Sequence, residues 1–118
     1  SSSQAQVSAS DQSNLISRIT NAVRPCYNLG SLSGTSAEDI VVRLRIQPSR
    51  DGSLSSRQVS VLGAQGVNGS NREYQRQMVE AARSAVLNPR CPLPSLPDSM
   101  YENGWSDVVL RFIPAQLT

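Results

Sequence analysis

Hydrophobic and polar side chains alternate strictly over residues 39–47. The apolar members are Ile40, Val42, Leu44 and Ile46, and the positions between them are Val41, Arg43, Arg45 and Gln47. Successive side chains leave opposite faces of a strand, so this period of two indicates a half-buried β-strand. Because the second face carries two arginines, we expect that face to meet solvent.

The segment after this strand predicts a hairpin. Arg50-Asp51-Gly52-Ser53 follows the alternating run, and Asp-Gly is a strong turn signal because Gly readily adopts positive φ and Asp tolerates it. Residues 58–62 alternate again, more weakly, and predict the second strand. Residues 63–69 are rich in glycine and predict a loop.

A first helix is predicted by apolar residues at helical spacing. These residues are Leu15, Ile16, Ile19 and Val23. Asp11 or Ser13 is expected to cap this helix, and Pro25 to end it near Arg24 because proline disfavours the helical conformation of the residue before it. Residues 1–10 are mostly Ser, Ala and Gln and are expected to form a disordered linker.

A second helix is predicted from Ser70 to about Leu87. Ser70 and Glu73 match a capping box, and Pro89 ends the helical segment. Its apolar stripe consists of Tyr74, Met78, Ala81, Ala82 and Ala85. Such small side chains let a helix lie close to a sheet, so we interpret the stripe as core.

The C-terminal part predicts an extended crossing and a last strand. Residues 91–97 contain three prolines, with Leu93 and Leu96 as apolar anchors. Trp105 then opens a strand over residues 107–113, which Pro114 ends. One face of this strand carries Val108, Leu110 and Phe112, and the other carries Val109, Arg111 and Ile113.

Together these elements predict one α+β domain over residues 11–118, in the order α-β-β-α-β. The first strand is expected to lie between the other two and antiparallel to both, which gives the spatial order 2-1-3. Two main helices are expected on one face of the sheet. The last strand then lies at an edge of the sheet.

Composition excludes several classes of function. The net charge is only +2 and aromatic residues make up 4% of the 118 residues, whereas non-specific nucleic-acid binding needs clustered cations and stacking platforms. No apolar run approaches 18 residues, so we expect no membrane span and no signal peptide within these residues. A membrane link would then require an N-terminal anchor outside them.

The two cysteines, Cys26 and Cys91, each lie beside a proline just after a predicted helix. We predict that they form a disulfide, which implies an oxidising compartment; a pair of buried free thiols is the alternative. The chain has no His, so a catalytic thiol or serine lacks its usual base. We therefore expect no zinc site and no cofactor.

An alternative function is a small hydrolase whose catalytic groups are all carboxylates, namely Glu73, Glu80 and Asp107. Glu73 and Glu80 lie seven residues apart on one helix, a spacing more typical of a solvated helix face than of an acid and base pair. We expect a binding module and not an enzyme. A passive envelope spacer is a third, purely structural interpretation.

Four features in order resemble one known family. They are Pro25-Cys26-Tyr27-Asn28 after a short helix, the strand–Asp-Gly–strand unit over residues 41–54, the Ala-rich segment 81–86 leading to Cys91-Pro92, and the terminal apolar strand 105–112 followed by Pro114. This set, over residues 15–114, resembles the TonB/TolA C-terminal domain family, and within it the TolA domains of alphaproteobacteria.

The resemblance implies a monomeric periplasmic domain at the end of a stalk anchored in the inner membrane. It implies protein partners such as TolB and Pal in the Tol-Pal envelope system. It also implies that colicins and the coat protein of filamentous phage can bind the same domain. A TonB-type energy transducer that binds outer-membrane transporter boxes is the alternative.

We predict that a partner binds at the last strand by strand addition. The candidate residues are Asp107, Val108, Val109, Leu110, Arg111, Phe112 and Ile113. Side chains on the face away from the helices would read the partner, and Arg111 could contact a carboxylate. The alternative is that residues 115–118 or the proline-rich crossing cover this edge.

Overall fold

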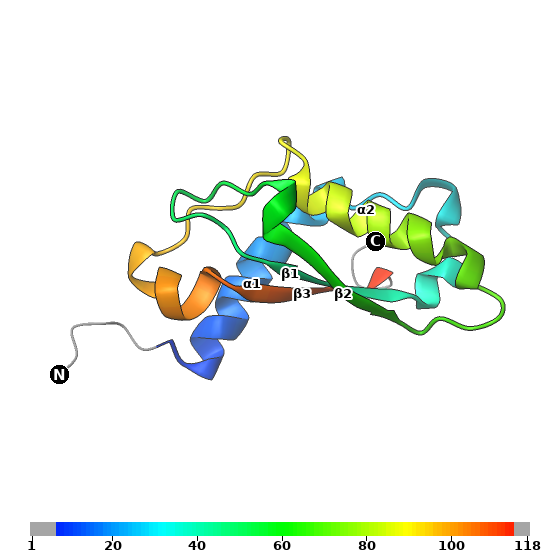
Figure 1. Cartoon of the computed structure of the whole chain (residues 1–118), viewed down its shortest axis with the longest axis horizontal. Coiled ribbons are helices and arrows are strands. Elements are labelled where there is room, and N and C mark those ends of the chain that lie inside the picture. Colours follow the sequence, from blue (N-terminus) through cyan, green and yellow to red (C-terminus); the bar gives the residue numbers. More distant parts are fainter. Residues whose placement is uncertain (1–6, 115–118) are drawn as a thin grey trace.

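The computed structural model describes residues 7–114. Its main elements are α1 (Ala9–Val23), β1 (Val41–Ile46), β2 (Val59–Gln65), α2 (Gln75–Leu87) and β3 (Val108–Phe112). The sheet has the order β2-β1-β3, and β1 is antiparallel to both neighbours (Figure 1). The predicted α-β-β-α-β fold and strand order 2-1-3 are therefore confirmed. No helix within residues 7–114 has the length and apolarity needed to cross a bilayer.

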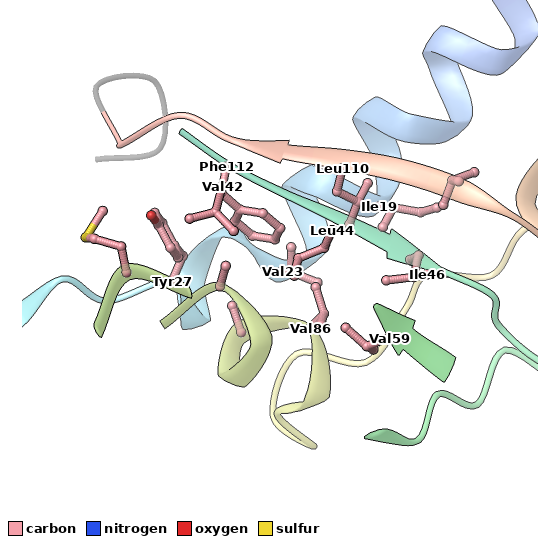
Figure 2. Packing of buried hydrophobic residues seen from close by; sticks show 14 of the residues in the cluster. Ile19, Val23, Tyr27, Val42, Leu44, Ile46, Val59, Val86, Leu110 and Phe112 are labelled. Atoms are coloured by element: carbon pink, nitrogen blue, oxygen red, sulfur yellow. The ribbon is translucent and has the colours of Figure 1, made fainter. Parts of the chain in front are cut away.

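One hydrophobic core joins the sheet to both helices. In β1, Val42, Leu44 and Ile46 are fully buried, and Figure 2 shows them among side chains from the other elements. These side chains include Ile19 and Val23 of α1, Val86 of α2, and Leu110 and Phe112 of β3. Complete burial of each such side chain stabilises the fold by about 1.5–3 kcal/mol.

Helix α1 begins earlier than the sequence predicts. Ser8 is the N-cap: its hydroxyl accepts from the N–H of Asp11, and the Asp11 carboxylate accepts from the N–H of Ser8. Capping by Asp11 or Ser13 is therefore wrong. Ala9 and Ser10, which were expected in the linker, are helical, while residues 1–6 lie outside the described part.

The predicted capping box at Ser70 and Glu73 does not form. The Ser70 hydroxyl instead donates to the side chain of Asn68, and a 3₁₀ turn, Arg72–Tyr74, precedes α2. The neighbouring residue Asn71 is fully buried. Its amide nitrogen donates to the carbonyls of Ser36 and Gly66, both at 3.0 Å, and its oxygen accepts from the N–H of Asn68 at 2.8 Å. A buried amide thus ties the loop 66–71 to the distant segment at Ser36, where sequence suggested a helix cap.

The hairpin between β1 and β2 is longer than a tight turn. Asp51-Gly52 does turn the chain, with Gly52 at φ 85°, but it lies inside the long connection 47–58. Arg50 of this connection forms solvent-exposed ion pairs with Asp98 and Glu102 at 2.9 and 3.0 Å, and its guanidinium lies 4.6 Å from the centre of the Tyr101 ring. The Tyr101 hydroxyl donates to the carbonyl of Pro48 at 2.7 Å. The connection is held by tertiary contacts that the local sequence does not reveal.

Strand β2 also differs from the prediction, because it continues through Gly63 to Gln65 where a loop was expected. Its register with β1 shifts between Arg43 and Leu44, so that Leu62 has no partner across the ladder. This is a β-bulge, which bends and interrupts an edge strand.

The segment between α2 and β3 is held by a disulfide to the end of the α1 region and by a hydrogen bond within the segment. Cys26 and Cys91 form the predicted disulfide, which joins the end of the α1 region to the chain after α2. Trp105 is buried in a π-helical turn, Tyr101–Trp105, and does not open the strand as expected. Its indole N–H donates to the carbonyl of Pro97 at 2.7 Å.

Asn71→Asp is expected to destabilise the fold by about 2 kcal/mol or more, because a carboxylate oxygen would replace the buried amide nitrogen that donates to two backbone carbonyls. Asn68→Asp is the matched control. The Asn68 side-chain oxygen only accepts, from Ser70 and Asn71, so a carboxylate preserves its bonds. Urea unfolding of both variants measures the difference, and equal stabilities would contradict the role given to Asn71.

Cys26→Ser with Cys91→Ser is expected to cost about 2–5 kcal/mol of unfolding free energy, because the disulfide restricts the unfolded chain. Denaturant unfolding with and without reductant measures this loss. The double variant should not respond to reductant, whereas the wild type should. Two titratable thiols in unfolded, unreduced protein would disprove the bridge.

Candidate strand-addition edge

The seven predicted binding residues lie together at the outer position of the sheet, where β3 has only β1 as a neighbour. The side chains of Val108, Leu110 and Phe112 are buried in the core, while those of Val109 and Arg111 are exposed. The predicted alternation of faces is confirmed. The three buried side chains could not meet a partner without unfolding β3.

The backbone direction along β3 follows from β1. Gln47, directly after β1, donates its N–H to the carbonyl of Gln58 on the β2 side at 2.9 Å. Peptide groups of successive residues point alternately to the two neighbouring strands, so Ile46 and the alternate residues before it face β3. Their register partners are Val108, Leu110 and Phe112. The N–H and C=O groups of Val109 and Arg111 therefore face away from β1.

The two edges of the sheet differ in protection. The β2 edge is interrupted by the bulge at Leu62, a common device against edge-to-edge pairing. Strand β3 pairs with β1 in unbroken register and contains no proline. None of the proline-rich residues 91–97 is among the described residues that line the groove beside this edge. Ser95 instead accepts from Arg18 at 2.5 Å and Pro97 from Trp105. The other expected cover, residues 115–118, lies outside the described residues.

A groove of about 420 Å³ runs beside β3. Its lining consists of Val109, Arg111 and Ile113 from the strand and Ile16, Ser17, Thr20, Asn21 and Arg24 from α1. Helix α1 contacts β3, and Figure 1 shows the helix crossing the strand in projection. The sequence predicted that Val109, Arg111 and Ile113 lie on the sheet face away from the helices. In the structure, residues of α1 nevertheless line the same groove as these three. An added strand would therefore lie against a preformed helical wall.

The α1 residues of the groove were missed by the sequence interpretation. Leu15, Ile19 and Val23 are buried as expected, whereas Ile16 is only half-buried. The signal was available: Ile16, Thr20 and Arg24 recur every four residues and form a second stripe beside the core stripe. Their spacing indicates a common face but not what that face meets.

One ion pair crosses the outer face of the sheet. Arg45 of β1 donates two hydrogen bonds to the carboxylate of Asp107, at 2.8 and 2.5 Å. These bonds, aided by the charge of Arg45, lower the pKa of Asp107 from its ordinary value. Arg45 is 46% and Asp107 41% exposed, so water screens the attraction and the pair contributes little to stability. It mainly orients Asp107 at the start of β3.

Other candidate chemistry is dispersed. Glu80 lies 4.0 Å from Arg83 in an ion pair on α2, while Asp107 is held on the sheet. Burial raises the pKa of Tyr27 to about 12, so its hydroxyl stays protonated at neutral pH. The ring of Tyr27 packs against that of Phe112, with 5.2 Å between the ring centres. Within residues 7–114, no three His, Cys, Asp or Glu side chains form a group suited to a metal ion.

Comparisons with known proteins add no assignment. No protein-family model, curated protein or solved structure matches the chain. The functional argument therefore rests on the edge of β3 and the groove beside it.

Asp107→Asn is expected to lower stability slightly at about pH 7, and this effect is expected to shrink as the pH falls below the pKa of Asp107 in the unfolded chain. The pKa of Asp107 is lower in the folded than in the unfolded chain. The ionised pair therefore contributes stability above the unfolded pKa, about 3.9, and this contribution is lost as pH falls through the folded pKa. Urea midpoints of wild type and variant across this range measure it. Arg45→Gln should behave alike, and a difference that persists at low pH argues against the pair.

Proposed function

We propose that this chain is a periplasmic protein-interaction domain of the Tol-Pal envelope system, of the TolA type, which binds its partners by strand addition at β3. The observation that carries the proposal is the edge position of β3: Val109 and Arg111 turn their backbone N–H and C=O groups away from β1, the only neighbouring strand within residues 7–114, and a groove lies beside them. A peptide paired there would gain main-chain hydrogen bonds that depend little on its sequence.

Two further features support the proposal. The observed elements follow the same order as the four sequence features on which the family resemblance rests. The Cys26–Cys91 disulfide is compatible with an oxidising compartment such as the periplasm. On this proposal the domain is not an enzyme. It couples the inner membrane, through an anchor outside these residues, to TolB or Pal on the outer-membrane side.

The test is a single backbone methyl group on the amide of Val109. Cys91 allows native chemical ligation, so residues 91–118 can be synthesised with N-methyl-Val109 and joined to residues 1–90 before oxidation with Cys26. The methyl group removes an outward donor and obstructs pairing, but it leaves the β1 side of β3 intact. Binding of purified TolB and Pal is expected to fall about tenfold or more, measured by calorimetry.

The matched control is N-methyl-Leu93, placed in the proline-rich segment, which lines other grooves. It should bind as the unmodified ligated protein does, and circular dichroism should show the same fold for all three. Unchanged binding by folded N-methyl-Val109 protein refutes strand addition at this edge. If the unmodified domain does not bind TolB or Pal but binds transporter box peptides, the TonB-type alternative replaces the TolA-type proposal.

A further inference from the structure

The groove beside β3 carries positive charge without compensation. Arg24 and Arg111 are two of its lining residues, and no Asp or Glu is among the described residues that line it. Neither arginine takes part in an ion pair with another described residue. The nearby Arg45 differs, because Asp107 neutralises it on the same sheet face.

A third arginine increases this local charge. Arg43 of β1 lies directly opposite Arg111 in the β1–β3 register, so both side chains leave the outer face of the sheet. Like charges directly opposite one another destabilise a strand pair. The Nε of Arg43 is also buried without a hydrogen-bond partner among the described residues. The isolated domain thus holds an unfavourable arginine pair that a carboxylate at the edge would relieve.

The charge is confined to one end of the groove. Helix α1 and β3 run in the same direction, since Leu15 lies against Gly104 before the strand and Tyr27 meets Phe112 at its end. Ile16 and Val109 therefore lie toward one end of the groove, and Arg24 and Arg111 toward the other. Val109 is 41% exposed. The groove consequently offers an apolar end at Ile16 and Val109, followed by a stretch in which Arg24 and Arg111 lie beside Ile113.

The geometry points to an acidic strand-forming peptide as the partner segment. Its apolar residues cover Ile16 and Val109, and its carboxylates bind Arg24 and Arg111. Successive side chains of an added strand leave opposite faces, so one carboxylate can reach Arg111 on the outer face and a neighbouring one Arg24 on the helix side. Arginine favours carboxylates because its planar donors match their two oxygens. This inference rests on the proposed strand addition and adds the chemistry of the partner.

A library of random short peptides displayed on yeast and selected on the oxidised domain tests this. Selected peptides are expected to be enriched in Asp and Glu next to apolar residues. The variant Arg24→Gln with Arg111→Gln should lose that enrichment, and a purified acidic peptide should bind it about tenfold or more weakly. Arg57→Gln is the matched control, since Arg57 is exposed directly before β2 at the opposite edge of the sheet. It should retain both properties.

The outcomes separate this inference from the proposed function. Selected peptides that are sensitive to N-methylation of Val109 but show no acidic excess overturn the acidic partner and leave strand addition standing. Acidic peptides whose binding survives that methylation overturn strand addition, and with it the placement inferred here. No enrichment of any peptide overturns the acidic segment as a partner. Both proposals are supported if acidic peptides are selected and their binding is lost both on methylation of Val109 and on replacement of Arg24 and Arg111.

Discussion

Strand β1 is the element on which the rest of the structure depends. It is paired on both edges, and it buries Val42, Leu44 and Ile46 completely on one face. A strand buried on one face needs a cover, and α1 and α2 supply it by packing their apolar stripes into the same core. Its other face carries Arg43 and Arg45, and Arg45 is exposed to solvent there. This one-sided burial dictates a two-layer domain with an open sheet face.

A three-stranded sheet of this kind has two edge strands, β2 and β3, and they differ in regularity. The bulge at Leu62 breaks the β2 edge, whereas β3 remains regular. Helix α1 packs against β3 through Ile19 and Val23 and turns Ile16 and Arg24 toward the groove at its edge. The core contacts that fix α1 therefore also shape the wall beside the open edge, so stability and the candidate binding site share one helix.

Electrostatics on the outer face follow the strand register. Because β1 and β3 are antiparallel in the observed register, Arg43 faces Arg111 while Arg45 can reach Asp107. One arginine is thereby neutralised within the domain and the other two are not. The net charge of the chain, only +2, does not reveal that two arginines on this face lack an ion-pair partner among the described residues. The favourable place for an external carboxylate is set by register and not by composition.

The sequence by itself determined the elements whose pattern is local. Alternation specified β1 and β3, helical spacing specified α1 and α2, and these gave the strand order and the edge position of β3. It also indicated the disulfide. Only the tertiary structure decided the roles of Asn71, Arg50 and the α1 side of the groove, because their partners lie far away in the chain. A side chain's spacing shows which face it occupies, but what that face meets depends on how distant elements pack.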